Sequence, residues 1–467
     1  MIFDAHHLPG LRPEDIGEWS EREAGDGLTL RFPVLEPDRL LQIGAGLRAA
    51  RLRALAERPV ASIITAIDAA AARLADPGSP LRALAEHALP IVTGYSAPMV
   101  QLILDRMSAD WRRAALEQLV VSELGRADAL DSFGPGRRPG VRSRAYGPEL
   151  SLHIFAGNVP GVGVTSLVRA LLVRSAAIAK TAAAEPILAV LFARALAEAA
   201  PDLASCIAVT HWPSGSDLDR AAAASADTLV VYGGAEAVRA FRRHAAPLAR
   251  VIEHGPRLSV GLIGREALAT AATARPAAHA AARAVATFDQ QGCVSPHAFF
   301  VEAGAPVEPR AFARMLASEL DALEEVLPRG RLDAAESAVI HAVRATAEFR
   351  AIAGDDIELI AGPGTSWTVI YAGDGAFEPV CLNRTVRVLP VASLEGCVPG
   401  LLPFRALLQT VGLTGTGSRT AALAHALGAA GATRIAPLER MPWPPPDWHH
   451  DGRGPLMELV RWVDLEE

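Results

Sequence analysis

Cys293 is the residue of this sequence whose surroundings best suit nucleophilic chemistry. It lies in the segment TFDQQGCVSPHAFFVE, where the polar residues before it make a purely apolar core position improbable. Gly292 allows close approach of the backbone and Pro296 prevents simple helical continuation, so we expect the sulfur at a rigid turn facing a cleft. A thiolate placed there can act as a nucleophile. By contrast, Cys206 and Cys397 have the surroundings of structural cysteines.

Lys180 stands in the segment SAAIAKTAAAEP and is the single lysine among the 45 lysines and arginines of this 467-residue chain. Chance use in an arginine-rich composition is one explanation. The other is a ligand contact, because AAIAKT has the pattern of a strand and parallel α/β sheets bind ligands beyond the carboxyl ends of their strands. A compact ammonium is not freely replaced by a planar guanidinium at such a place.

Gly233 and Gly234 link a strand pattern to a helix pattern in VVYGGAEAVRAF. The first turn of such a helix has free N–H groups and a partial positive charge, which suits a pyrophosphate. An ordinary strand-to-helix turn is the alternative reading. The segment GVGVTS begins like a dinucleotide-binding fingerprint, but Ser166 stands where the third glycine belongs, so it is weak support.

The elements that position these residues follow an α/β order. Residues 1 to about 145 read mostly as helices, and the Gly/Pro/Arg segment near 132–150 as an exposed arm or hairpin. From Leu150 short apolar runs alternate with helical stretches, which predicts a parallel sheet joined by crossover helices. We expect a helical part and dinucleotide-binding domain over 1–262, a catalytic domain over 263–430, and a tail over 431–467 that packs back on the body.

The composition excludes several classes of function. A net charge of −7 gives no general electrostatic reason to bind nucleic acid or an anionic membrane surface. The N-terminal residues lack the basic and apolar regions of a secretory signal, and no membrane span is visible, so we expect a cytoplasmic protein. The four cysteines show no CxxC spacing, so we predict reduced thiols and no metal site.

Several motifs, taken in order, resemble the acyl-CoA reductase family of bacterial luminescence fatty-acid reductases, a branch of the aldehyde dehydrogenase superfamily. The resemblance runs from about Tyr146 to the C-terminus. It implies an aldehyde dehydrogenase-like α/β fold with a Rossmann-type cofactor domain, an α/β catalytic domain and a small oligomerisation element. The motifs are HIFAGNVPGVGV, AAIAKT, VVYGGAEAVRAF, VIEHGPRLSVGLI, FDQQGCVSPHAFFVE and GRGPLMELVRWVDLE.

The resemblance also implies a reaction. Cys293 matches the nucleophile that takes an acyl group from a thioester, and Asn158 matches the side chain that forms an oxyanion hole with the Cys293 backbone N–H. The acyl enzyme is then reduced to an aldehyde with hydride from NADPH, NADH being possible. Lys180 matches the superfamily lysine that contacts ribose hydroxyls or a 2′-phosphate. Thr181 adds a hydroxyl contact, and Gly233 with Gly234 matches the pyrophosphate site.

Three departures from the superfamily pattern concern charged groups. The KPxE pattern reads KTAA here, so an acidic ribose ligand is missing and NADPH is favoured over NADH. The glutamate that precedes an FGP motif in many relatives falls near LNRTV, where Asn383 or Arg384 stands instead. Glu253 occupies the place of the water-activating glutamate of hydrolytic relatives, which an acyl-transferring reductase should not use as such. We predict a proton role for Glu253, with a structural carboxylate as the alternative.

Three rival functions are open at this point. His297 could activate Cys293 in an acyltransferase or thioesterase without a dinucleotide, although Pro296 intervenes. A non-acylating aldehyde dehydrogenase would oxidise aldehydes to acids, with Glu253 as hydrolytic base. A catalytically silent chain could bind a carrier or synthetase subunit. For the reductase, the expected partners are acyl-CoA or an acyl-protein thioester, a possible acyl-protein synthetase or carrier protein, and a homo-oligomer; the acyl chain is left open.

Overall fold

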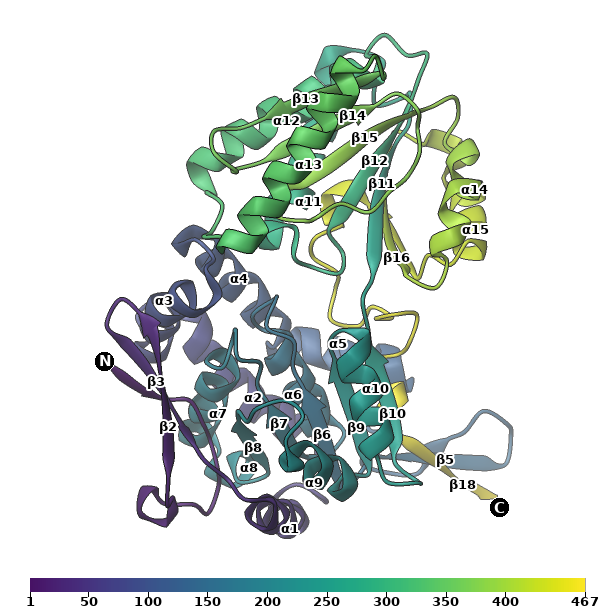
Figure 1. The fold of residues 1–467 in the computed structure, drawn as a ribbon. Helices are drawn as coiled ribbons and strands as arrows, with labels where there is room; N and C mark the ends of the chain where they lie inside the picture. The colour runs from purple at the N-terminus through teal and green to yellow at the C-terminus, as the bar shows by residue number, and fades with distance from the viewer. Residues whose placement is uncertain (467) are drawn as a thin grey trace. The chain divides into compact units, whose positions relative to one another are not determined.

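The computed structural model describes residues 1–466, which form two compact units (Figure 1). Unit 1 contains residues 1–93, residues 100–255 and the chain from Pro445 onward. Unit 2 contains residues 94–99 and 256–444. The division after Gly255 falls in the short link between two strands that belong to different sheets, whereas the sequence placed the boundary at 262. Residues 431–444, assigned to the tail from sequence, belong to unit 2.

The regular structure within the first 33 residues is mainly strands, although the sequence suggested mostly helices over 1–145. β1 (Ile2–Asp4), β2 (Trp19–Gly25) and β3 (Leu28–Pro33) make a three-stranded sheet in the order β1-β3-β2. The helices that were expected follow it. They are α1 (Pro37–Ala54), α2 (Val60–Ala75), α3 (Pro80–Thr93), α4 (Ala97–Asp110) and α5 (Arg113–Leu124).

The centre of unit 1 is a five-stranded parallel sheet in the order β10-β9-β6-β7-β8. Its strands are β6 (Leu150–Ile154), β7 (Ala176–Lys180), β8 (Ile207–Thr210), β9 (Thr228–Tyr232) and β10 (Arg250–His254). The crossover helices are α6 (Val162–Leu172), α7 (Leu188–Ala199), the short α8 (Pro201–Ala204), α9 (Asp217–Ser225) and α10 (Ala235–His244). From β6 the chain adds β7 and β8 on one side, and it then adds β9 and β10 on the other side of β6. The order of the strands therefore switches between β6 and β9, and ligands of such sheets bind beyond the carboxyl ends of the strands at that point.

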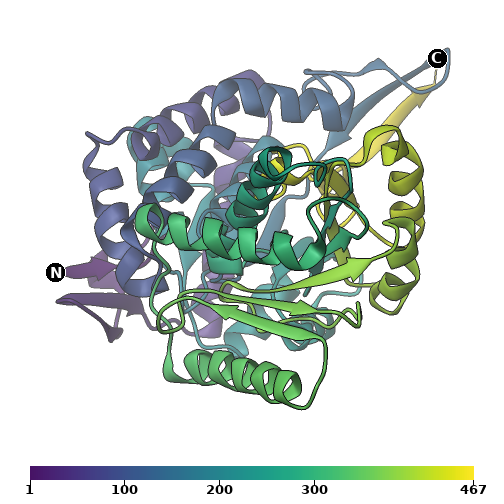
Figure 2. The same ribbon diagram turned by 90° about the horizontal axis from the view of Figure 1, so that it is seen from above.

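Unit 2 is built on a seven-stranded sheet in the order β13-β14-β15-β12-β11-β16-β17, in which only β13, among the described strands, runs antiparallel to its neighbour. The strands are β11 (Leu258–Ile263), β12 (Pro296–Glu302), β13 (Ile357–Ala361), β14 (Thr368–Ala372), β15 (Thr385–Val391), β16 (Leu408–Thr414) and β17 (Arg434–Pro437). Helices α11 (Ala271–Ala286) and α12 (Pro309–Val326) cover one face. Figure 2 shows α13 (Ala334–Ile352) on the opposite face, where α14 (Val398–Leu401) and α15 (Thr420–Ala429) also pack.

The arm predicted near 132–150 is a hairpin of β4 (Gly134–Pro135) and β5 (Val141–Tyr146). The last described strand, β18 (Arg461–Glu466), pairs antiparallel with β5 and gives a fourth sheet in the order β18-β5-β4. The tail of the chain therefore returns to unit 1. Within the described residues, no helix combines the length and the apolar character that a membrane crossing requires.

Candidate active site

Cys293 lies in the loop between α11 and β12 of unit 2, three residues before β12 begins. The residue is half-buried and forms no disulfide. The Ser259 hydroxyl donates a hydrogen bond to the Cys293 carbonyl oxygen at 2.8 Å, which ties the loop to the first residues of β11. The rigid turn and the cleft expected from the sequence stay predictions.

Arg434, at the start of β17, is a cation near Cys293 that the sequence reading missed. Burial lowers the pKa of Arg434 to about 10, and the negative charge of a Cys293 thiolate opposes that shift. Its guanidinium also donates to the carbonyl oxygens of Met441 and Arg440 at 2.8 and 2.7 Å. Cations close to a cysteine in general favour the thiolate, which is the reactive form of cysteine. Nothing in the local sequence ATRIAP indicates this proximity.

Asn383 and Arg384, the residues at the missing-glutamate position, both point into unit 2. The Asn383 side-chain oxygen accepts a hydrogen bond from Gln291 Nε2 at 2.6 Å. Arg384 has no exposed surface and forms ion pairs with Asp289 at 2.7 Å and Glu324 at 2.8 Å. These contacts hold the loop that carries Cys293.

Asn158 lies in the loop that follows β6, at the switch point of the unit 1 sheet, and is exposed. Gly161 in the same loop has a φ of 96°, a conformation that favours glycine, and it immediately precedes α6. Asn158 belongs to unit 1 and Cys293 to unit 2. The pairing of the Asn158 amide with the Cys293 N–H therefore stays a prediction.

Lys180 ends β7 and is almost completely buried. Its ammonium forms an ion pair with Asp219 at 2.8 Å and donates to the Ser214 hydroxyl at 3.2 Å. The Nζ atom also lies over the rings of Trp212 and Phe241, at 5.4 and 5.7 Å from their centroids. Burial lowers the pKa of Lys180, and the hydrogen bond and charge of Asp219 oppose this.

The other predicted cofactor residues lie at the same edge of the unit 1 sheet. The Thr181 hydroxyl is buried and is directed at the Thr210 carbonyl oxygen, 3.5 Å away. Gly233 donates its N–H to the His254 carbonyl oxygen at 3.1 Å. Gly234 precedes α10, whose N-terminus has no side-chain cap within residues 1–466. A side-chain carbon placed at Gly234 would meet no atom within 4 Å, so the space in front of this helix is open.

Glu253 lies near the carboxyl end of β10 and is paired with Arg242 of α10, Oε1 to Nε, at 2.6 Å. The Glu253 side chain retains 21% of its exposure, so it is accessible from solvent. The pairing is compatible with both sequence interpretations, a proton role and a structural carboxylate.

His297, the residue on which the acyltransferase reading depends, lies in β12. Its Nδ1 accepts the Val380 backbone N–H at 3.3 Å. Burial lowers the pKa of His297 to about 4. The imidazole is therefore neutral near pH 7 and does not supply an imidazolium partner for a thiolate.

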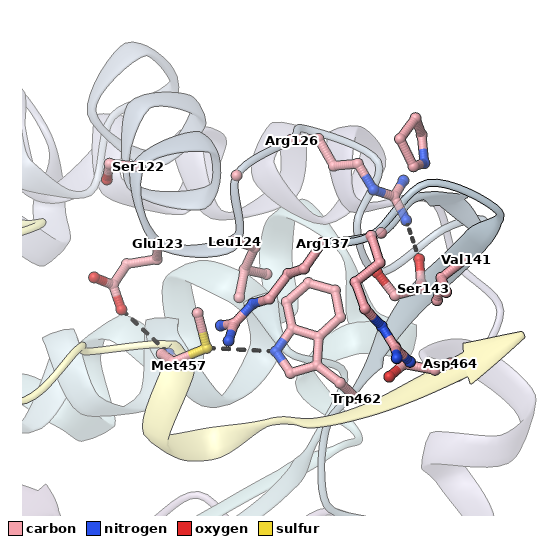
Figure 3. A pocket seen from close by; sticks show the side chains of 14 residues that line it. Ser122, Glu123, Leu124, Arg126, Arg137, Val141, Ser143, Met457, Trp462 and Asp464 are labelled. Carbon is pink, nitrogen blue, oxygen red and sulfur yellow. Dashed lines mark hydrogen bonds between the residues drawn. The ribbon is translucent and has the colours of Figure 1, made fainter.

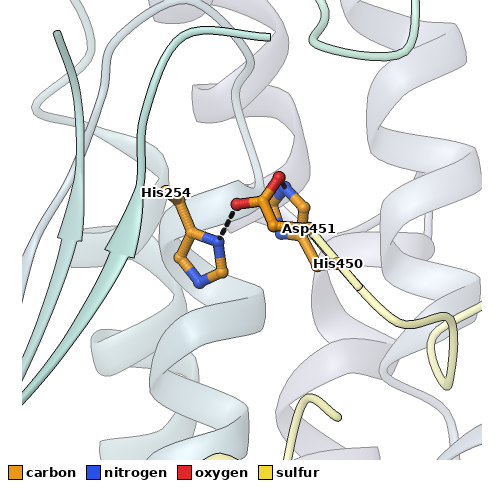
Figure 4. Close-up of side chains that lie close together, drawn as sticks. All are labelled: His254, His450 and Asp451. Carbon is orange, nitrogen blue, oxygen red and sulfur yellow. Dashed lines mark hydrogen bonds and ion pairs between the residues drawn. The ribbon is translucent and has the colours of Figure 1, made fainter. Parts of the chain in front are cut away.

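The sequence reading also missed a cluster of His254, His450 and Asp451 in unit 1 (Figure 4). Asp451 accepts a hydrogen bond from His254 Nδ1 at 2.7 Å. The two imidazoles stack at 4.3 Å, and Tyr232 and Trp448 extend the stack on either side. The lone pair of an imidazole nitrogen lies in the plane of its ring. Because the two rings are stacked nearly parallel, one ion cannot lie in both ring planes at once. The cluster thus attaches the tail to the ends of β9 and β10.

A pocket of about 730 Å³ lies elsewhere in unit 1, between the end of α5, the arm and the tail (Figure 3). Trp462 lines it and donates its Nε1–H to the Met457 sulfur at 3.4 Å. Arg126, another lining residue, donates to the Ser143 carbonyl oxygen at 2.6 Å. None of the predicted site residues lines this pocket, so its size alone does not mark it as the catalytic centre.

Comparisons with solved structures identify the fold. The structure is similar to an aldehyde dehydrogenase of Pseudomonas aeruginosa, with a TM-score of 0.75, 15% identity, and coverage of 97% of this chain and 94% of that one. It is also similar to the NADP-dependent glyceraldehyde-3-phosphate dehydrogenase of Bacillus halodurans, solved in complex with NADP, with a TM-score of 0.73, 14% identity and 96% coverage of both chains. The predicted aldehyde dehydrogenase-like fold is confirmed.

Comparisons with characterised sequences identify the family. The chain is 26% identical over 383 residues to the long-chain acyl-protein thioester reductase 2 of Photobacterium leiognathi, and 28% identical over 394 residues to the long-chain acyl-protein thioester reductase of Photorhabdus luminescens. In both cases the match covers 80% of this chain and 75% of the relative. The sequence profile of the acyl-CoA reductase (LuxC) family matches residues 55–462, and this chain belongs to that family.

Proposed function

We propose that this protein reduces an acyl thioester to an aldehyde through a covalent acyl-Cys293 intermediate. The observation that carries the proposal is the half-buried Cys293, on a loop fixed immediately before β12, in a chain of the acyl-CoA reductase family. A thiolate combines strong nucleophilicity with good leaving-group character, which thioester exchange and aldehyde release both need.

The Cys293 thiolate attacks the thioester carbonyl carbon, the Cys293–acyl bond forms, and the bond to the donor sulfur breaks, so that the donor leaves as a thiolate and takes a proton from solvent. A hydride then adds to the acyl carbon, giving a thiohemiacetal oxyanion on Cys293. Its collapse breaks the carbon–sulfur bond and releases aldehyde and thiolate. The Asn158 amide and the Cys293 N–H are assigned to the oxyanion, where loss of one donor typically reduces the rate about 100- to 1,000-fold. The Arg434 guanidinium stabilises the thiolate before attack and after collapse.

A nicotinamide dinucleotide supplies the hydride when bound. The residues of unit 1 fit such a group: the first-turn N–H groups of α10 and the open space at Gly234 suit the pyrophosphate. Thr181 and Lys180 lie at the carboxyl end of β7, the adenosine side of such sheets. Asp219 and Ser214 engage two of the three N–H donors of the Lys180 ammonium, which leaves one for a ribose hydroxyl or a 2′-phosphate.

NADPH is the proposed cofactor, and Arg22 is the residue that favours it. Asp219 neutralises Lys180, so the lysine alone contributes little net attraction for a 2′-phosphate. Arg22 of β2 reaches the same sheet edge and donates to the Ala183 carbonyl oxygen at 2.6 Å. Its guanidinium has further N–H donors in a fork that matches phosphate geometry. KTAA stands in place of an acidic ribose ligand, so the cation beside Ala183 favours a 2′-phosphate at this edge.

Glu253 is proposed to exchange a proton with the thiohemiacetal oxygen as the intermediate forms and collapses. Its partial exposure gives it access to solvent protons, and Arg242 holds its carboxylate at the end of β10. This assignment predicts that Glu253→Gln slows aldehyde release more than the acylation of Cys293. A purely structural carboxylate would slow neither step selectively.

The donor is proposed to be acyl-CoA or an acyl-protein thioester, with an acyl-protein synthetase or carrier protein as a partner. The relatives named above are acyl-protein thioester reductases, which favours a protein-borne donor. The proposed site of action is the cytoplasm, where thiols stay reduced. A homo-oligomer is also proposed, because β18 is the edge strand of its sheet. An edge strand can pair its free backbone groups with a strand of a second copy.

The test incubates the full chain with NADPH and acyl-CoAs from short to long chain, and measures NADPH loss together with aldehyde. The expected result is stoichiometric aldehyde formation that Cys293→Ser abolishes. Cys381→Ser is the matched control, because Cys381 is also a half-buried thiol of unit 2. Thioester labelling that persists in Cys293→Ser would contradict the assignment, and free carboxylate formed without coenzyme A would favour a non-acylating dehydrogenase.

A further inference from the structure

Two short stretches of unit 2 adopt left-handed backbone without glycine. Phe288, Asp289 and Gln290 have φ values of 56°, 47° and 66°. A second stretch has the same conformation: Leu382 (66°), Asn383 (53°) and Arg384 (60°). Side chains with a Cβ atom disfavour this region, and three in succession are rare. Such conformations persist where surrounding contacts enforce them, and they concentrate at functional sites.

A buried ion pair joins the two stretches. The Arg384 guanidinium reaches Asp289 Oδ1 through Nε at 2.9 Å and through a terminal nitrogen at 2.7 Å. Its remaining donors reach Glu324 at 2.8 Å and the Leu327 carbonyl oxygen at 2.9 Å. The second Asp289 oxygen accepts the Gly330 N–H at 3.0 Å. Arg384 therefore fastens the first stretch to α12 and to the loop that follows it.

Side-chain amides complete the connection. Gln290 is fully buried, accepts the Thr385 N–H at 2.8 Å, and donates to the carbonyl oxygens of Thr385 and Pro296 at 2.8 and 2.7 Å. It thus bridges the first residues of β12 and β15. Gln291, the residue after the first stretch, donates to Asn383 of the second stretch at 2.6 Å, which adds another link. Residues 289–291, which precede Cys293, are therefore held by hydrogen bonds to residues 383–385.

We infer that Arg384 is a positioning residue that holds the Cys293 sulfur and the Cys293 N–H in their reactive geometry through Asp289 and Gln290. Arg384 itself has no exposed surface, so it does not touch the substrate. Cys293 follows Gln290 by only three residues, and Pro296 begins β12, so relaxation of the left-handed stretch moves the Cys293 backbone. The oxyanion contact depends on that N–H, and this inference therefore rests on the proposed function.

The test compares two reactions of Cys293 in the full chain: single-turnover acylation by an acyl-CoA and alkylation by iodoacetamide. Alkylation needs the thiolate but no oxyanion donor. In Arg384→Gln we expect the acylation rate constant to fall about 100-fold, the range seen when one oxyanion donor is lost. The alkylation rate and the acyl-CoA concentration for half-saturation should change less than about threefold. Arg384→Lys, which keeps the charge but not the fork, should restore part of the acylation rate.

Arg419→Gln is the matched control, because Arg419 pairs at 2.8 Å with the buried Glu302 at the opposite end of β12. It should lower the urea midpoint comparably and leave acylation unchanged. If Arg384→Gln does not fold, Gln291→Ala removes one link without leaving a buried charge, and should show the same selective loss to a smaller degree. If the wild type is acylated and a folded Arg384→Gln or Gln291→Ala variant is acylated at the same rate, the inference about Arg384 is overturned and the proposed function stands. Absence of wild-type acylation would overturn the proposed function as well.

Discussion

Removal of the Lys180 ammonium should destabilise unit 1 far more than removal of both members of its ion pair. In Lys180→Met the Asp219 carboxylate stays buried without its cation. Loss of one partner of a buried pair typically costs about 3–5 kcal/mol, whereas replacing both by neutral groups is often close to neutral. Both side chains are at most 5% exposed, so solvent compensates little.

Asp219 also accepts hydrogen bonds from Trp212 Nε1 at 2.8 Å and from the Gly215 N–H at 2.7 Å. The two donors reach different oxygens of Asp219, so Asp219→Asn keeps an acceptor for only one of them. The double variant Lys180→Met/Asp219→Asn removes the unpaired charge and should still recover about 2 kcal/mol of the loss predicted by adding the single effects. With a slope of about 3 kcal/mol/M, Lys180→Met should lower the urea midpoint by about 1 M.

The assay is urea unfolding of the full chain, followed by circular dichroism and by tryptophan fluorescence, in a double-mutant cycle. NADPH titration of the same four proteins separates the cofactor role, because Lys180→Met and the double variant should both bind NADPH more weakly than the wild type. Single-variant losses below about 1 kcal/mol, or strictly additive losses, would refute the buried-pair reasoning. Unchanged NADPH binding in the folded double variant would refute the cofactor role of Lys180.

Three further outcomes test other residues. Arg22→Ala should raise the Kd for NADPH about tenfold and leave the Kd for NADH within about twofold, because one charge-assisted contact is worth about 1.5 kcal/mol or more. Fluorescence titration measures both constants. Equal weakening of NADPH and NADH binding would exclude recognition of the 2′-phosphate by Arg22. Arg434→Gln should move the pH midpoint of Cys293 alkylation upward, while Arg440→Gln, which removes an exposed guanidinium nearby, should not. The pKa of buried His297 is about 4, so the unfolded chain binds more protons between pH 6.5 and 4 and stability falls as pH falls through that window. In His297→Asn the new side-chain oxygen can accept the Val380 N–H, so the fall in the free energy of unfolding over this pH window should be smaller by up to about 3 kcal/mol. The variant should also retain acylation. Loss of acylation would favour the function in which His297 activates Cys293.

The alternation of apolar runs and helical stretches from Leu150 predicted the unit 1 sheet closely, because each crossover needs its own local pattern. The N-terminal strands were missed because β2 is polar along most of its length and packs only part of one face. A usable signal was present: Asp26 and Gly27, with φ values of 47° and 74°, form a two-residue link between β2 and β3, and Asp-Gly is a strong hairpin signal.

The candidate site residues were named from the sequence, but their partners in the structure were not. Lys180 was recognised as exceptional, yet Asp219 lies 39 residues further on and nothing local marks it as the counterion. Arg384 stood where a ligand-binding glutamate was expected, and only the packing of α12 shows that it points inward. Arg22 comes from a segment with no matching motif. Long-range pairing of charges depends on the assembled fold and has no periodicity that a sequence displays.

The pairing of β18 with β5 has a consequence for how the chain is made. Unit 1 needs residues from both sides of unit 2, so at the ribosome its last strand and the His450–Asp451 segment emerge only after the whole of unit 2 has been synthesised. Unit 2 is an uninterrupted stretch apart from residues 94–99 and can form earlier. Closing so long a loop slows folding more than it weakens the final state. Until β18 has been made, the nascent chain holds an incomplete unit 1 in which the β5 edge that pairs with β18 is bare, a state prone to aggregation.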